Sequence, residues 1–174
     1  MLKRLIPFVL VLTCACAPAH SVQQTMKNAR SGHPGDDLRA RLGVTLPRSD
    51  SMIIVYGVAQ HHTRSRWSVI AWRSPNGTWT VERAGEESSG LLRVKPHALP
   101  SSKKILTGSE AAQLDRLIKD KDVFREAVQA GEVSVGGFGS TMEIVTPKGK
   151  RTVEWVGRLT GKLGEIADLV IGAS

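Results

Sequence analysis

The chain has 174 residues, with 24 basic against 16 acidic side chains and a net charge of +8. This length is typical of one folded domain that buries its own core. After the N-terminal residues no window is apolar enough to resemble a membrane span, which excludes a multi-span membrane protein. A positive net charge is compatible with anionic partners, but it is equally typical of a soluble basic surface.

The first 19 residues carry the pattern of a secretory signal peptide. Lys3 and Arg4 precede an apolar stretch at residues 5–12, which is about half of the roughly 20 residues needed to span a bilayer. The tripeptide Ala-Pro-Ala at 17–19 fits the small-x-small cleavage pattern. We therefore expect the mature protein to begin at His20 and to be periplasmic or secreted.

A lipoprotein signal is the alternative interpretation of the same segment. Acylation of Cys14 or Cys16 would anchor the protein to the outer membrane. Both cysteines of the chain lie in this segment, so cleavage after Ala19 removes Cys nucleophiles, Cys metal sites and thiol redox chemistry from the candidate functions. The same cleavage lowers the net charge from +8 to +6, because Lys3 and Arg4 are lost.

Residues 20–51 are polar and rich in glycine and proline, which predicts a flexible polar leader with one helical turn near residues 37–42. Residues 52–174 are predicted to form a single globular domain. Its first strands are expected at residues 52–59, 66–73 and 78–83, where β-branched and aromatic residues gather.

The pair Asn76-Gly77 predicts a two-residue type I′ turn between the second and third strands. In that register, Ile70, Trp72, Trp79 and Val81 share one side of the hairpin and Trp67, Val69 and Ala71 share the other. Residues 85–90, including Glu86 and Glu87, are expected to form a solvated turn.

A short strand is expected at 91–95, further strands at 141–146 and 151–156, and a last helix at 160–171. Thr107 and Glu110 form a capping box that opens a helix whose apolar stripe includes Leu114, Leu117 and Ile118. Hairpin-length connections between strands indicate an α+β fold, with an antiparallel sheet of about six strands and two to three helices packed on one face.

The candidate binding residues are those where aromatic and basic side chains occur together, or where two histidines are adjacent: Trp67, Arg64, Arg66, Arg73, His61 and His62. Trp67 is equally compatible with packing on a strand face. Adjacent histidines chelate one metal poorly, because neighbouring residues of a strand point to opposite faces. The glycine-rich residues 136–139 lead into a strand rather than a helix, which favours a connection over a phosphate site. We assign no catalytic residue, no metal site and no cofactor.

Three functions are compatible with these features. The first is a non-catalytic exported protein, periplasmic or associated with the envelope, that binds an anionic polymer, lipid head groups or a protein partner. The second is a hydrolase or metal-dependent enzyme that uses His61 or His62. The third is an exported enzyme inhibitor or immunity-type protein.

Overall fold

The computed structural model describes residues 32–60, 63–89, 95–129 and 138–174. The expected signal peptide, His61, His62 and most of the short strand expected at 91–95 lie outside the described residues. The described elements, in chain order, are α2 (Asp36–Leu42), β1 (Met52–Gln60), β2 (Thr63–Arg73), β3 (Trp79–Ser89), β4 (His97–Ala98), β5 (Ser102–Ile105), α3 (Gly108–Lys119), the 3-10 helix η1 (Lys121–Phe124), β6 (Phe138–Thr146), β7 (Gly149–Val156) and α4 (Gly161–Gly172).

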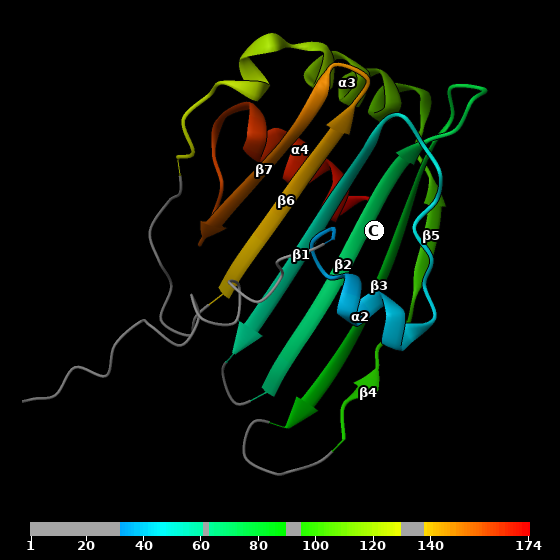
Figure 1. The fold of residues 1–174 in the computed structure, drawn as a ribbon, viewed down its shortest axis with the longest axis vertical. Helices are drawn as coiled ribbons and strands as arrows, with labels where there is room; N and C mark the ends of the chain where they lie inside the picture. The colour runs from blue at the N-terminus through cyan, green and yellow to red at the C-terminus, as the bar shows by residue number, and fades with distance from the viewer. Residues whose placement is uncertain (1–31, 61–62, 90–94, 130–137) are drawn as a thin grey trace, which may run out of the picture.

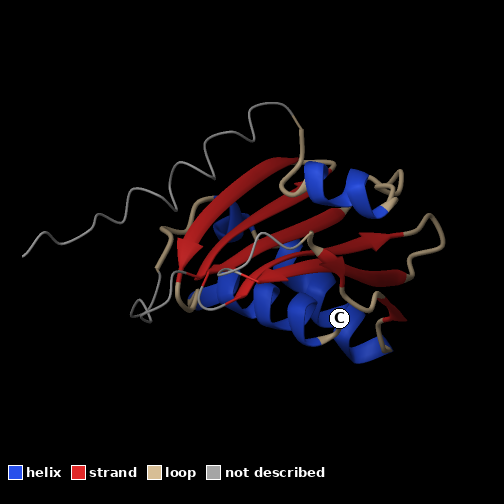
Figure 2. Ribbon diagram, turned by 90° about the horizontal axis from the view of Figure 1, so that it is seen from below, coloured by secondary structure: helices blue, strands red, loops and turns tan. Residues whose placement is uncertain are grey.

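The strands form one antiparallel sheet in the order β4-β3-β2-β1-β6-β7, with β5 also pairing with β3 (Figure 1). The predicted α+β fold is confirmed, with seven strands in the sheet. Helices α3 and α4 cover one face of the sheet, while α2 lies on the other (Figure 2). We call these two faces the helical face and the α2 face.

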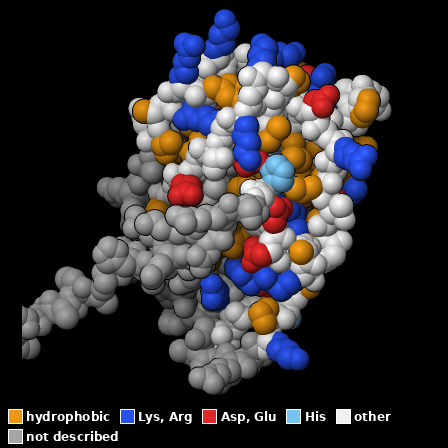
Figure 3. All heavy atoms as spheres, viewed as in Figure 1, with side chains coloured by type: hydrophobic (Ala, Val, Ile, Leu, Met, Phe, Trp, Pro, Cys, Tyr) orange, Lys and Arg blue, Asp and Glu red, His pale blue; other side chains and the backbone are white. Residues whose placement is uncertain are grey.

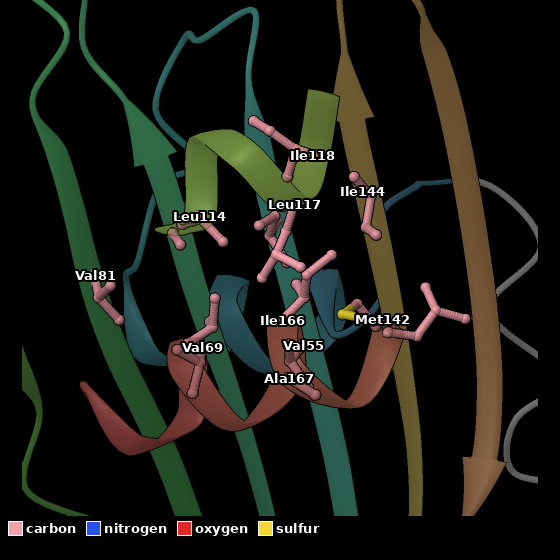
Figure 4. Close-up of a cluster of buried hydrophobic side chains, with 14 of the residues drawn as sticks. Val55, Val69, Val81, Leu114, Leu117, Ile118, Met142, Ile144, Ile166 and Ala167 are labelled. Atoms are coloured by element: carbon pink, nitrogen blue, oxygen red, sulfur yellow. The ribbon is translucent and has the colours of Figure 1, made fainter. Parts of the chain in front are cut away.

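The main core lies between the sheet and helices α3 and α4. Alternate strand residues such as Val55, Val69 and Met142 point toward Leu117 and Ile166 of the two helices (Figure 4). The capping box predicted for α3 is confirmed, because the Thr107 hydroxyl accepts from the Glu110 amide and the Glu110 carboxylate accepts from the Thr107 amide. The helix predicted at the C-terminus is also present, as α4.

The expected flexible leader contains a packed helix. Residues 36–42 form α2, and Leu38 and Arg39 are buried against the sheet. Asp36 and Asp37 occupy the first turn and Arg39 and Arg41 the last, which matches the helix dipole at both ends. The helical turn predicted near residues 37–42 is confirmed as α2, but its packing against the sheet was not predicted, because one fully buried leucine gives too short an apolar pattern to indicate a buried face.

The β2–β3 hairpin has a different turn from the predicted one. Gly77 donates to the Ser74 carbonyl at 2.8 Å, Ser74 donates to the Thr78 carbonyl at 2.9 Å, and only Gly77, with φ of 88°, is left-handed in the turn. This is a three-residue turn, for which Pro75 has a suitable φ at the first corner. The register shifts by one residue, so Trp79 and Val81 lie on the helical face, opposite to Ile70 and Trp72.

Strand β3 is also longer than predicted. It continues to Ser89, and Glu86 is buried rather than in a solvated turn. The predicted turn at residues 85–90 is wrong. Glu86 is stabilised in the strand by Arg41 and Arg66 from other elements, and the local sequence does not reveal these pairs.

Trp67 packs flat over a glycine of the neighbouring strand. A Cβ atom added to Gly57 would lie 2.2 Å from a carbon of the Trp67 ring. We expect Gly57→Ala to lower the free energy of unfolding by about 1–3 kcal/mol, because the added methyl overpacks a buried contact.

Urea unfolding of the purified chain measures this effect. Gly108→Ala is the matched control, because nothing lies within 4 Å of the added atom. Equal unfolding midpoints for the two variants would contradict the described contact.

Candidate functional site on the α2 face

The structure separates the candidate binding residues that it describes. Trp67 belongs to the core of the helical face, with only 7% of its surface exposed, and the Arg83 guanidinium lies 5.8 Å from its ring centroid. Arg73 has the same strand parity as Trp67, and its guanidinium lies 3.4 Å from Asp115 of α3. Arg64 and Arg66 have the opposite parity. These residues therefore do not form one aromatic and basic patch.

Arg66 instead belongs to a charged network on the α2 face. Its guanidinium pairs with the Glu86 carboxylate, which also accepts from Arg41 at 3.2 Å. Asp37 lies 3.2 Å from Arg41 and 3.4 Å from Arg66. Two arginines and two carboxylates thus join α2 to β2 and β3.

The pKa values of Glu86 and of the neighbouring Tyr56 are shifted in this environment. Burial of Glu86 opposes its ionisation, but hydrogen bonds from Arg66 and Arg41 outweigh burial and lower the pKa of Glu86 below its ordinary value of 4.5. Burial raises the pKa of the Tyr56 hydroxyl, and the positive charge of Arg66 offsets this only in part. At neutral pH Glu86 in the charged network is therefore ionised, and the neighbouring Tyr56 is protonated.

Arg39 fixes the position of α2 on the sheet. Its buried guanidinium donates to the Pro34 carbonyl and to the Ser68 hydroxyl, both at 2.7 Å, and pairs with Asp36. Its Nε has no hydrogen-bond partner among the described residues. The remaining donors of this buried cation are directed at α2, the preceding turn and β2.

A second attachment lies one turn before α2. His33 Nδ1 contacts the carboxylate of Glu143, whose side chain is only 2% exposed, and Lys150 Nζ lies 2.7 Å from the other carboxylate oxygen. The His33 amide donates to Asp36 at 2.7 Å. The buried charge of Glu143 is thus compensated by β7 and by the segment before α2.

Beside these charges lies a partly exposed apolar surface. Buried Met52, Ile54 and Ile70 support it from below. We define the α2-face patch as the partly buried side chains that pack on them together with the exposed end of β5: Val44, Leu46, Trp72, Val145 and Ile105. Figure 3 shows hydrophobic side chains gathered on this face beside a histidine, with Asp and Glu side chains next to it and Lys and Arg side chains at the upper and right-hand margins and lower on the face.

The strand pairing explains how the patch arises. Met52 lies opposite both Val145 and Trp72, Trp72 lies opposite Thr80, and Thr80 lies opposite Ile105. One row of side chains therefore crosses the sheet from β6 to β5. Trp72 and Trp67 are both on β2 and lie on opposite faces of the sheet, with Trp72 on this partly exposed face and Trp67 in the core of the helical face.

Sequence reasoning missed most of this site. The His33–Glu143 contact joins residues 110 positions apart, and the pair of Arg39 and Ser68 is 29 positions apart. One local signal was present in the strand at 141–146. Glu143 lies between the apolar residues Met142 and Ile144, so its side chain points to the face of the sheet opposite to theirs.

Among the described residues, no group of three or more His, Cys, Asp or Glu side chains is arranged to hold a metal ion. In the same part of the chain, no helix has the length and apolar character needed to cross a membrane.

We expect Glu86→Gln to lower the free energy of unfolding by about 1–3 kcal/mol at neutral pH, because Arg41 and Arg66 lose their shared anion. The folded-state pKa of Glu86 lies below its value in the unfolded chain. Its stabilisation is therefore complete above about pH 4.5 and is lost as the pH falls through the lower, folded-state pKa.

Denaturant unfolding at pH 7 and below pH 4 measures both effects. Glu87→Gln is the matched control, since Glu87 accepts a hydrogen bond from the Ser65 hydroxyl and a glutamine oxygen can do the same. A difference between wild type and Glu86→Gln that stays constant with pH would contradict this role of Glu86.

The chain matches none of the protein-family models compared with it, and a search among curated proteins returned no match.

Proposed function

We propose that this protein is exported and that it binds an anionic lipid surface through the α2-face patch, as a binding protein rather than an enzyme. The observation that carries the proposal is the combination of a partly exposed tryptophan and a 64% exposed isoleucine with lysine and arginine side chains around them. Proteins that bind a membrane surface combine apolar insertion with electrostatic attraction in this way.

Two basic side chains are placed at the patch by their contacts or strand pairing, and two more are close to patch residues in the chain. Lys103 lies with its ammonium 5.1 Å from the Trp72 ring centroid, and Lys150 lies directly opposite Val145. Arg48 follows Leu46 by two residues, and Lys148 is in the turn after β6. We call Arg48, Lys103, Lys148 and Lys150 the basic rim, and all four are exposed.

Acidic side chains at the patch are few. Glu82 is paired with Lys103 at 3.4 Å, Glu143 is paired with Lys150 at 2.7 Å, and Asp50 is exposed in the segment that leads to β1. The four basic side chains against these three carboxylates leave a net charge of +1 at the patch. Lipid is favoured over an anionic polysaccharide because Trp72 and Ile105 can enter the interfacial layer of a bilayer, whereas a sugar chain offers them no apolar phase.

A vesicle-binding experiment tests the proposal. We expect the triple variant Arg48→Gln, Lys103→Gln, Lys148→Gln to bind vesicles with 30% phosphatidylglycerol about 100-fold more weakly, at about 1 kcal/mol for each basic side chain near an anionic surface. Lys150 is left in place because it neutralises Glu143. Co-sedimentation at low and at physiological salt gives the affinities.

The matched control removes three exposed basic side chains from α3 and η1, on the other side of the sheet: Arg116→Gln, Lys119→Gln, Lys121→Gln. We expect the control to keep most of the binding. Equal losses in the two variants would show an effect of net charge alone and overturn the proposal. Binding to a heparin-like polymer but not to vesicles, or to neither, would overturn it too.

The N-terminal pattern of residues 1–19 supports export, with a periplasmic or secreted mature protein. On expression in a Gram-negative host, intact-mass measurement is expected to show a chain that begins at His20. A mass increased by acyl groups and an N-terminus at Cys14 or Cys16 would instead establish the lipid-anchored alternative in the outer membrane.

A further inference from the structure

The two edges of the sheet differ in length and protection. One edge consists of β4 and β5, which have two and four residues, and β5 carries Lys103 and Lys104. Short, lysine-bearing edge strands resist pairing with another chain. The opposite edge is β7, which also carries Lys150 and Arg151 but has eight residues and no proline and pairs with β6 alone among the described strands. Because of its length, β7 is the described edge better able to accept another strand.

From the residue pattern of this edge, we propose that β7 pairs antiparallel with β7 of a second copy of the chain, about a two-fold axis at Thr152. A two-fold pair of identical strands brings a residue opposite to its own copy at the axis and opposes residues at equal distances on either side. Centring on Thr152 places Lys150 of each copy opposite the partner's Glu154. Two ion pairs thus flank the axis.

The other registers are less favourable. An axis at Lys150, Arg151 or Glu154 brings two like charges directly opposite each other, which destabilises a strand pair. An axis at Val153 leaves Lys150 and Glu154 opposite uncharged residues. Among the registers centred on residues 150–154, the one at Thr152 is the one that pairs opposite charges within β7 twice.

The side chains involved are available for this contact. Lys150, Thr152 and Glu154 are all exposed and share one face of the strand, because they are two residues apart. Lys150 is 51% exposed while it contacts Glu143, and an ammonium group has three donors, so it can also pair with the partner's Glu154.

The pairing has a geometric consequence. Residues directly opposite each other in a strand pair lie on the same face of the sheet, so the dimer presents both α2 faces on the same side. Two α2-face patches would then lie on one continuous sheet. The dimer itself does not depend on the proposed lipid binding.

Crosslinking of a central cysteine tests the register. Thr152→Cys is expected to give a dimer with a short thiol-reactive crosslinker, because the two cysteines lie opposite each other at the axis. Lys148→Cys is the matched control, since the two copies of residue 148 would be roughly 27 Å apart at about 3.4 Å per residue. The parent chain measures any background from Cys14 and Cys16. Crosslinking of Lys148→Cys as strongly as Thr152→Cys would overturn the register.

Light scattering coupled to size-exclusion chromatography tests the dimer itself. We expect twice the monomer mass for the parent chain, and a dissociation constant raised about tenfold or more in Glu154→Lys, which replaces both ion pairs by repulsion. Glu165→Lys makes the same charge change on the exposed side of α4 and is expected to keep the dimer. A monomeric parent chain, or equal weakening by both variants, would overturn the proposal whatever the result of the vesicle experiment.

Discussion

The register of the β2–β3 hairpin is the constraint on which the rest of the structure depends. The three-residue turn sets Arg73 opposite Trp79, and this pairing sends Trp79 and Val81 into the core under α3 and α4. Trp72, which precedes Arg73 on β2, lies on the opposite face, where it is the centre of the α2-face patch. A shift of one residue would exchange the two faces of β3 and place its tryptophan outside the core.

On the α2 face, charged side chains hold the helix on the sheet, whereas on the helical face apolar packing holds the two helices. Helix α2 buries one leucine fully and is otherwise held by Arg39, by the arginines around Glu86, and by His33 on Glu143. Each buried charge has an opposite charge or several hydrogen bonds as compensation, which is the condition for its burial. The α2-face patch extends from Val145 on β6 across the sheet to Ile105 on the edge strand β5.

The fold could be predicted from the sequence in outline, because strands and helices leave local patterns. The β-branched run of β1 and the capping box at Thr107 each predicted an element that the structure contains. The candidate site could not be predicted in the same way. The Asn76-Gly77 pair suggested a two-residue turn, but Pro75 favours the longer one, and the resulting register places Trp79 and Val81 on the face of Trp67 instead of the face of Trp72. The attachments of α2 join distant residues, and no local pattern reveals them.

The central claim is that the α2-face patch meets an anionic bilayer. Hydrogen–deuterium exchange with and without phosphatidylglycerol vesicles tests it directly, because it reports which backbone segments become protected on binding. The account predicts protection at residues 43–48 and in β5, with no change in α3 and α4. Protection confined to α3 and α4, or no change in any segment when the protein is bound, would contradict it.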